Sequence, residues 1–353
     1  MSDPRFQELD ALVRARQRFV LSTHVNPDGD GLGSEVAFAL YLRGLGKDVH
    51  VLNDGKFPPN FEYLNAHFPL ETFTPERAEA LFARAEVLAV FDMQNRDRLG
   101  RLEPYLGRPG LTVVILDHHV GNAAFGHLNL VYPEAAATGE LVYDFIRRDP
   151  QGITRPIAEA LYTALVTDTG SFRHSNTDPE AHAMAGALLE RGVQSAVVQS
   201  WIYQVRQPNR LRFLGHLLQD LRLNDDGTVA WFEVPQTLFG RYGVEGSDTE
   251  GLVDFPRTLP GVEAVVLFTE LPGGQVKVSM RSSGRVDVNA VAHAFAGGGH
   301  RFAAGATVAG SLPEARDKVL ARLREAIARL EPAVRPAIAR VGDGGEPARA
   351  AGG

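Results

Sequence analysis

Four short apolar runs in the first half of the chain have the length and β-branched composition of buried strands. They cover residues 19–22, 48–52, 87–91 and 111–120, and a Pro-Gly turn at Pro109-Gly110 lies just before the last run. Segments with apolar residues at helical spacing lie between the runs, one beginning near Gly33 and another at Thr74. Strands that alternate with helices predict an α/β fold, in which a parallel sheet carries helices on both faces.

The second half of the chain changes from helical to mixed patterns. Helical patterns cover 138–148, 155–166, 179–191 and 195–221, the last with an interruption at Pro208. After Thr228, strand patterns cover 229–234, 264–270 and 275–281, and helical patterns cover 287–295 and 313–330. We therefore predict a first domain over 1–191, a helical linker over 192–225 and a smaller α/β domain over 226–334. Residues 335–353, rich in Gly, Ala, Pro and Arg, are predicted to be a disordered tail.

Composition narrows the classes of protein that this sequence encodes. The 353 residues, 44% of them hydrophobic, are enough for two domains with cores of their own. The chain has no cysteine, which excludes disulfides, thiolate nucleophiles and Cys-ligated zinc or iron–sulfur sites. Its formal net charge of −7 argues against a general binder of long nucleic acids. The start of the chain is polar and no window reaches membrane-spanning length, so we expect a cytoplasmic protein without a membrane partner.

Acidic and imidazole side chains follow three of the predicted strands where these end, and a further acid follows a helix. In a parallel sheet the carboxyl ends of the strands share one edge, where ligands bind. Carboxylates gathered there repel by roughly 1 kcal/mol per pair in water, and divalent cations would relieve the repulsion. Oxygen and imidazole ligands without sulfur favour Mn²⁺ or Mg²⁺, and two such cations suit the hydrolysis of a phosphate ester. The residues are His24, Asp28, Asp30, Asp92, Asp117, His118, His119 and Asp168.

The order of several motifs resembles a known family. Taken alone, the triplet at 117–119 also fits an acid that caps a turn beside two solvated histidines. The whole set, however, resembles the DHH phosphoesterase superfamily with its DHH-associated C-terminal domain. Within the superfamily, the length and the second domain look most like the bifunctional oligoribonuclease and 3′-phosphoadenosine-5′-phosphate (pAp) phosphatase group. The motifs are His24-x-x-x-Asp28-x-Asp30, Asp92, Asp117-His118-His119, Thr167-Asp168-Thr169-Gly170, Arg281-Ser282-Ser283, Asp287-Val288-Asn289, Gly297-Gly298-Gly299-His300 and Ala303-Ala304-Gly305.

The resemblance implies a site with two divalent ions, Mn²⁺ foremost and Mg²⁺ as the alternative. One ion would be bound by His24 and Asp28, and Asp92 would bridge the pair. The ligands of the other ion would be Asp30, His118 and Asp168.

Three further residues would act beside the metals. Asp117 would orient a histidine without binding a metal itself, and His119 would act near the scissile phosphate. The resemblance also implies a phosphate-binding arginine, for which Arg98 is the first candidate. Arg96 is a rival, because residues 93–95 depart from the small or hydroxyl residues expected there.

The second domain would bind the substrate. Backbone N–H groups at Gly298 and Gly299 would approach an anion closely, and Arg281, Ser282 and His300 would add side-chain contacts. The competing interpretation is that these glycines only end the preceding helix. His174, close to Asp168 in sequence, is an open case between a residue lining the site and a surface residue.

The resemblance therefore implies a hydrolase whose site lies in a cleft between the two domains. Its substrates would be short RNA, degraded to 5′-mononucleotides, and pAp, converted to AMP. A second anchor at a fixed distance from the metals, together with the acidic charge balance of the chain, predicts a preference for about two to five nucleotides. The alternatives are a phosphodiesterase for cyclic or linear signalling dinucleotides and a nucleotide-binding regulator without activity. The assembly stays open, with a homodimer as one alternative.

Overall fold

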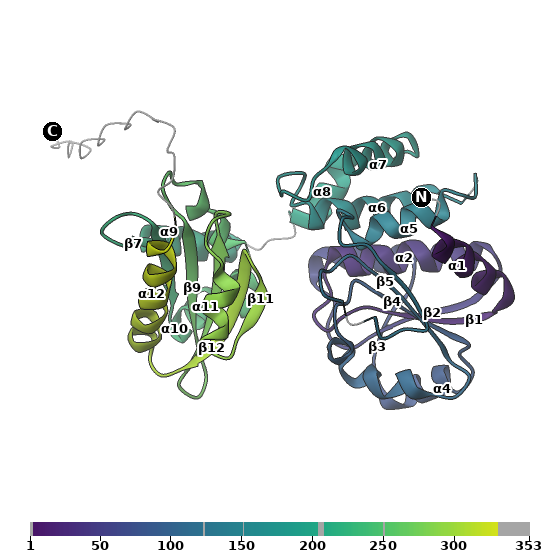
Figure 1. The fold of residues 1–353 in the computed structure, drawn as a ribbon, viewed down its shortest axis with the longest axis horizontal. Coiled ribbons are helices and arrows are strands. Elements are labelled where there is room, and N and C mark those ends of the chain that lie inside the picture. Colours follow the sequence, from purple (N-terminus) through teal and green to yellow (C-terminus); the bar gives the residue numbers. More distant parts are fainter. Residues whose placement is uncertain (1–2, 123, 151, 204–207, 250, 331–353) are drawn as a thin grey trace. The chain divides into compact units, whose positions relative to one another are not determined.

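The computed structural model describes residues 3–122, 124–150, 152–203, 208–249 and 251–330 (Figure 1). The chain divides into two compact units, Met1–Val205 and Arg206–Gly353. Within the described residues, no helix combines the length and the apolar character needed to cross a membrane.

The first unit is built on a six-stranded sheet with the order β3-β2-β1-β4-β5-β6, and every pair of neighbours is parallel. The predicted α/β class is therefore confirmed. The two outer strands, β3 and β6, were not predicted because they are three and four residues long and only partly buried. The strands are β1 Arg18–Ser22, β2 Asp48–Asn53, β3 Leu70–Thr72, β4 Val87–Phe91, β5 Thr112–Asp117 and β6 Leu128–Val131.

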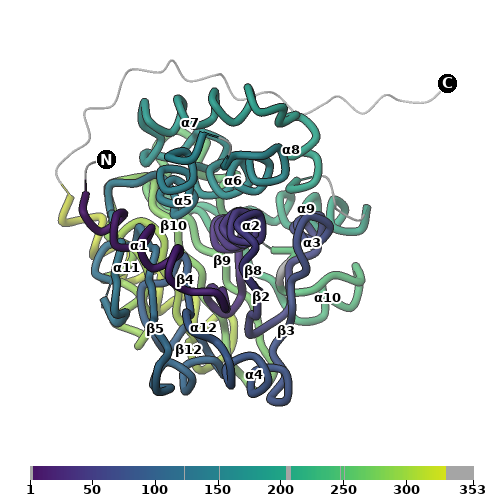
Figure 2. The backbone as a smooth tube through the Cα atoms, turned by 90° about the vertical axis from the view of Figure 1, so that its right-hand side faces the viewer, coloured from purple at the N-terminus to yellow at the C-terminus, as the bar shows by residue number. Residues whose placement is uncertain are grey.

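Helices cover both faces of this sheet, as Figures 1 and 2 show for α2, α5 and α6 on one side and α4 on the other. Alternate residues of β1 enter opposite cores, Phe19 and Leu21 beneath α2 and Val20 on the side of α4. The helices are α1 Pro4–Ala15, α2 Gly29–Gly44, α3 Glu62–His67, α4 Pro75–Phe82, α5 Thr138–Ile146, α6 Arg155–Asp168, α7 Pro179–Glu190 and α8 Ser195–Tyr203, with 3₁₀ segments η1 Pro59–Phe61 and η2 Arg96–Gly107.

Helix α2 begins earlier than the sequence predicted. We expected its start near Gly33, but it begins at Gly29, with the side chain of Asp28 accepting hydrogen bonds from the N–H groups of Asp30 and Gly31. The glycines of this first part of α2 serve close packing. A Cβ on Gly33 would lie 2.5 Å from the carbonyl oxygen of Ala160 in α6. Tertiary packing thus overrides the low helix propensity of glycine.

The second unit is a mixed six-stranded sheet with the order β11-β12-β10-β9-β8-β7, in which only β8 and β9 run parallel among the described strands. Its two faces are buried in separate cores, one with α11 and α12 and one with α9 and α10. Its elements are α9 Pro208–Gln219, β7 Arg222–Leu223, β8 Val229–Val234, α10 Gln236–Tyr242, η3 Gly246–Thr249, η4 Leu252–Asp254, η5 Pro256–Thr258, β9 Ala264–Leu271, β10 Gln275–Ser282, α11 Val288–His293, β11 Gly298–His300, β12 Ala303–Ala309 and α12 Leu312–Ala328.

Two predictions about the second half can be compared with the structure. The helical pattern over 195–221, with its interruption at Pro208, corresponds to two helices, α8 in the first unit and α9, which begins at Pro208, in the second; residues 204–207 between them lie outside the described residues. The glycines at 297–299 were expected either to form an anion-binding loop or to end the preceding helix, but Gly298 begins the edge strand β11. A Cβ on Gly299, whose φ is +143°, would lie 2.5 Å from the carbonyl oxygen of Ala303, so glycine permits this close pairing. The tail predicted over 335–353 lies outside the described residues.

Candidate metal centre

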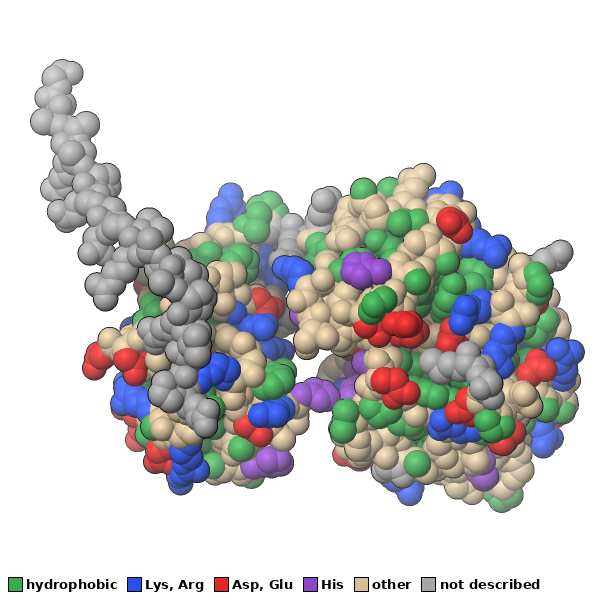
Figure 3. All heavy atoms as spheres, turned by 45° about the horizontal axis from the view of Figure 1, so that its top comes forward, with side chains coloured by type: hydrophobic (Ala, Val, Ile, Leu, Met, Phe, Trp, Pro, Cys, Tyr) green, Lys and Arg blue, Asp and Glu red, His purple; other side chains and the backbone are tan. Residues whose placement is uncertain are grey.

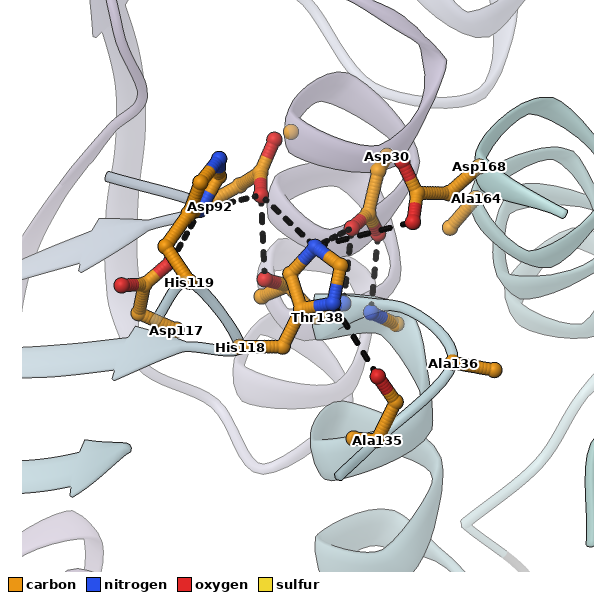
Figure 4. Close-up of polar contacts among 12 residues, drawn as sticks. Asp30, Asp92, Asp117, His118, His119, Ala135, Ala136, Thr138, Ala164 and Asp168 are labelled. Atoms are coloured by element: carbon orange, nitrogen blue, oxygen red, sulfur yellow. Dashed lines mark hydrogen bonds and ion pairs between the residues drawn. The ribbon is translucent and has the colours of Figure 1, made fainter. Parts of the chain in front are cut away.

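The carboxyl edge of the first sheet gathers the acids and histidines that the sequence singled out. Figure 4 labels six of them, Asp30, Asp92, Asp117, His118, His119 and Asp168. Asp92 directly follows β4, and Asp117 ends β5 beside His118 and His119. Asp168 is the last residue of α6. The remaining three residues lie between β1 and the first turn of α2 and are His24, Asp28 and Asp30.

One cluster surrounds the imidazole of His118. Its Nε2 lies 3.7 Å from Oδ2 of Asp30, 3.6 Å from Oδ2 of Asp168 and 3.5 Å from Oδ1 of Asp92. Asp30, His118 and Asp168 each offer a ligand atom within 4.8 Å of the others. The other ring nitrogen, Nδ1, donates to the carbonyl oxygen of Ala135 at 3.1 Å in the tautomer that leaves Nε2 a lone pair. This cluster therefore has the donor atoms and the orientation that a divalent ion requires.

A second cluster surrounds His24, which is 4% exposed. Its Nε2 lies 3.7 Å from Oδ2 of Asp28 and 3.5 Å from Oδ2 of Asp92. Asp92 thus presents Oδ1 to His118 and Oδ2 to His24. A carboxylate that divides its two oxygens between two ligand clusters has the geometry of a bridge between two ions.

The third possible grouping, Asp92 with His118 and His119, fits a metal less well. Nδ1 of His119 lies 3.5 Å from Oδ1 of Asp92 and 2.8 Å from Oδ1 of Asp117. If this nitrogen donates its proton to Asp117, it has no lone pair for a cation. Figure 4 shows His119 lying between Asp92 and Asp117.

The pKa values of Asp30, Asp168 and His24 are raised in a buried place with many negative charges. Burial and the neighbouring carboxylates raise the pKa of Asp30 well above its usual value. Burial also raises the pKa of Asp168 to about 6. Burial lowers the pKa of His24, but its contacts with Asp28 and Asp92 outweigh this and raise the pKa to about 10. Divalent cations neutralise such charge, and the donor set of carboxylates and imidazoles fits them.

Sequence reasoning missed the residues that hold the acids in place. The N–H groups of Thr138 and Gly139, at the start of α5, donate to Asp30 at 2.7 and 2.9 Å. The hydroxyl of Thr138 also donates to Asp92 at 3.3 Å. A helix was predicted from residue 138, and a helix N-terminus favours a carboxylate, but only the fold brings this one to Asp30.

The two candidate arginines lie in different surroundings. Nη2 of Arg98 lies 2.9 Å from Nδ1 of His24, whereas Arg96 forms an ion pair with Glu103 at 2.8 Å. Nδ1 of His24 is also 2.9 Å from the carbonyl oxygen of Val25. One tautomer donates to Val25 and the other accepts from Arg98, and only the first leaves Nε2 a lone pair for a metal.

His174 and the candidate substrate-binding residues of the second unit lie outside the two metal-ligand clusters. Nδ1 of His174 lies 3.1 Å from the carbonyl oxygen of Asp168, and the side chain is exposed. Ser282 is buried, and its hydroxyl oxygen accepts hydrogen bonds from the N–H groups of Gly284 and Val286. Arg281 is half-buried and donates to the carbonyl oxygen of Met280. In the second sheet, Arg281 of β10 lies opposite Ala303 of β12, and His300 of β11 pairs with the same Ala303 from the other side. Arg281 and His300 therefore lie at one corner of the second sheet.

Comparison with known proteins covers both units. The DHH family, N-terminal domain, matches residues 18–165, and the DHHA1 domain matches residues 228–329. The chain is 34% identical over 335 residues to the bifunctional oligoribonuclease and PAP phosphatase NrnA of Thermus thermophilus, covering 93% of this chain and 97% of that protein. It is 27% identical over 319 residues to NrnA of Bacillus subtilis, covering 90% and 96%.

A solved structure agrees with these sequence matches. An exopolyphosphatase-related protein from Bacteroides fragilis superposes with a TM-score of 0.87 at 26% identity, covering 91% of this chain and 96% of the other. The resemblance on which the sequence analysis relied is therefore confirmed: the chain belongs to the DHH family and carries that family's N-terminal domain followed by a DHHA1 domain.

Proposed function

We propose that this hydrolase uses two metal ions to degrade short oligoribonucleotides to 5′-mononucleotides and to convert pAp to AMP. The observation that carries the proposal is the division of Asp92 between two ligand clusters, Oδ1 toward His118 and Oδ2 toward His24. The similarity to the NrnA proteins, whose name states both activities, supports the substrate class.

The ligand roles follow from the two clusters. His24 and Asp28 bind one ion, the cluster around His118 binds the other, and Asp92 is shared by both ions. Oxygen and nitrogen donors favour Mn²⁺, with Mg²⁺ as the alternative. When bound, two such cations supply Lewis acidity and lower the pKa of water in the site. The ligands of the second ion are Asp30, His118 and Asp168.

Beside the metals, the chain's own residues orient the reacting phosphate and move a proton. Asp117 holds the ring of His119 through Nδ1, so His119 acts on the phosphate or its leaving oxygen. Arg98 binds a phosphate oxygen, because the tautomer of His24 that binds metal no longer accepts its hydrogen bond. Arg96 is engaged with Glu103, which makes it the weaker candidate.

The second unit binds parts of the substrate away from the reacting phosphate. Arg281 and His300 contribute side chains, Gly298 and Gly299 contribute backbone N–H groups, and Ser282 stabilises the adjoining turn. On the face drawn in Figure 3, basic and acidic side chains of the described residues are interspersed. Together with the net charge of −7, this offers little attraction to a long polyanion and favours substrates of about two to five nucleotides.

The proposal is tested by substrate rates and metal binding on the same preparations. We expect the purified protein to hydrolyse di- to pentanucleotides and pAp with added Mn²⁺, and to bind two ions per chain by calorimetry. Asp92→Ala should lose nearly all activity and at least one ion, because one side chain serves both clusters. Asp97→Ala is the matched control, since Asp97 is an exposed acid of the following segment.

Three results would contradict the proposal in different ways. One bound ion with an active Asp92→Ala variant would remove the bridging role. Faster hydrolysis of cyclic dinucleotides than of short RNA would show that the preferred substrate is a signalling dinucleotide. Binding of nucleotides without turnover would make the protein a regulator.

A further inference from the structure

The side-chain amide of Asn122 lies directly behind the Asp117–His119 pair. Its Nδ2 donates to Oδ2 of Asp117 at 2.5 Å and to the carbonyl oxygen of Met93 at 2.8 Å. Its Oδ1 accepts from the N–H of Ala124 at 2.6 Å. The two partners of Nδ2 are oxygens and the partner of Oδ1 is an N–H group, so these partners fix which end of the amide is the nitrogen.

Asp117 connects this amide to the histidine. The carboxylate is fully buried, with one oxygen bonded to Asn122 and the other to Nδ1 of His119. A carboxylate held at both oxygens cannot rotate without breaking a buried hydrogen bond, which costs about 1–3 kcal/mol. The position of the His119 ring therefore depends on the bond that Asn122 makes to the far side of Asp117.

The same region is joined twice to the loop that follows the neighbouring strand. Asn122 bonds the carbonyl oxygen of Met93, the residue after Asp92, and Nε2 of Gln94 donates to the carbonyl oxygen of Val120 at 2.7 Å. Strands β4 and β5 are neighbours, so these two bonds link the segments that carry the bridging acid and the histidine.

We propose that Asn122 is a positioning residue of the reaction, which holds Asp117 and, through it, the ring of His119. This inference rests on the proposed function, because it assigns Asn122 to the same catalytic step as His119. The competing role is purely local. In that case Asn122 would only accept the N–H of Ala124 and so shape the turn, in which Ala124 has a positive φ of 47°.

Two substitutions separate these roles. Asn122→Asp keeps the oxygen that accepts from Ala124 but replaces the donor by a second carboxylate beside Asp117. Asn122→Ala removes both functions. If Asn122 positions Asp117, both variants should lower kcat by about tenfold or more, the effect of losing one hydrogen bond to a carboxylate, with KM nearly unchanged. If it only shapes the turn, Asn122→Asp should keep its activity.

The coupling to His119 is measured in a double-mutant cycle. Asn122→Ala should reduce kcat much less in a His119→Ala background than in the wild-type chain. Asn129→Ala is the control, because the Asn129 amide bonds the backbone of Gly126 in the next turn. Its effect on kcat should be small and the same in both backgrounds.

Each outcome has a defined meaning. An equal fold loss from Asn122→Ala in both backgrounds, or an active Asn122→Asp variant, would overturn the inference while leaving the proposed function intact. Full activity of His119→Ala would overturn the catalytic role of His119 and with it this inference. Calorimetric titration with Mn²⁺ should give two ions for every Asn122 variant, and a loss of one would show that Asn122 supports a metal cluster instead.

Discussion

Replacing Gly33 by alanine tests whether the spacing of helices α2 and α6 determines the geometry of the candidate metal centre. Gly33 lies in α2, whose N-cap is Asp28 and whose first turn carries Asp30, and it contacts α6, whose last residue is Asp168. An added Cβ would lie 2.5 Å from the carbonyl oxygen of Ala160, about 1 Å short of an ordinary van der Waals contact. Backbone atoms cannot turn aside as a flexible side chain can, so the helices must separate.

The magnitude follows from two opposing effects. Overpacking a tight contact costs about 1–3 kcal/mol, whereas replacing glycine by alanine within a helix gains about 1 kcal/mol. We therefore expect a net loss of stability of about 0–2 kcal/mol. The effect on metal binding should be larger, because metal–ligand distances tolerate only about 0.2 Å and the two helices supply ligands to one cluster. Mn²⁺ affinity at that cluster should fall by about tenfold or more.

Calorimetric titration with Mn²⁺ and thermal unfolding measure both effects. Gly186→Ala is a matched control, because Gly186 also lies within a helix, α7, and a Cβ there would meet nothing within 4 Å. The control should gain stability and bind metal normally. If Gly33→Ala matches it in both measurements, the helices accommodate the methyl group and their spacing does not govern the site.

Two further predictions concern a buried acid and the edge of the second sheet. Burial raises the pKa of Glu35 to about 8, so the folded state favours the neutral acid and loses stability as pH rises from about 4.5 to about 8, by up to about 1.4 kcal/mol per unit. Glu35→Gln should accordingly raise Tm at pH 8 and leave it unchanged at pH 4, and an equal Tm difference at both would contradict this. Gly299→Ala should push β11 away from β12 and raise KM for dinucleotides, while calorimetry still finds two ions; an unchanged KM would count against a binding role for β11.

The sequence predicted which acids and histidines gather at one edge of the first sheet, because these residues stand at strand ends. Apolar runs located β4 and β5, and parallel strands place their carboxyl ends at one edge, so Asp92 and the triplet after β5 had to lie near one another. The resemblance to a known family then assigned the roles. Thr138, Asn122 and Gly139 were missed because they contact the acids through amides and a hydroxyl. Such groups occur throughout any chain, and only the fold shows which ones face a carboxylate.

Two of the errors in the fold have a common physical source in glycine. At Gly29 a low helix propensity suggested that the helix had not yet begun, yet packing of α2 against Thr167 of α6 requires the missing side chain. At 297–299 three glycines suggested an open loop, yet close pairing with β12 makes them the start of an edge strand. The local conformational preferences of glycine permit both loops and regular elements, and close packing against neighbouring elements determines which one forms.

The opposite edge of the first sheet offers a place to observe metal binding at the proposed site. Gly107 is exposed at the end of η2, shortly before β5, and a Cβ there would meet nothing within 4 Å. The six residues of β5 place roughly 20 Å between that end of the strand and the acids at the other. Because the chain has no cysteine, Gly107→Cys would carry the sole thiol of the protein. A fluorescent or spin label attached there would detect the binding of paramagnetic Mn²⁺ from a distance, without contact with any of the residues proposed to bind the metal.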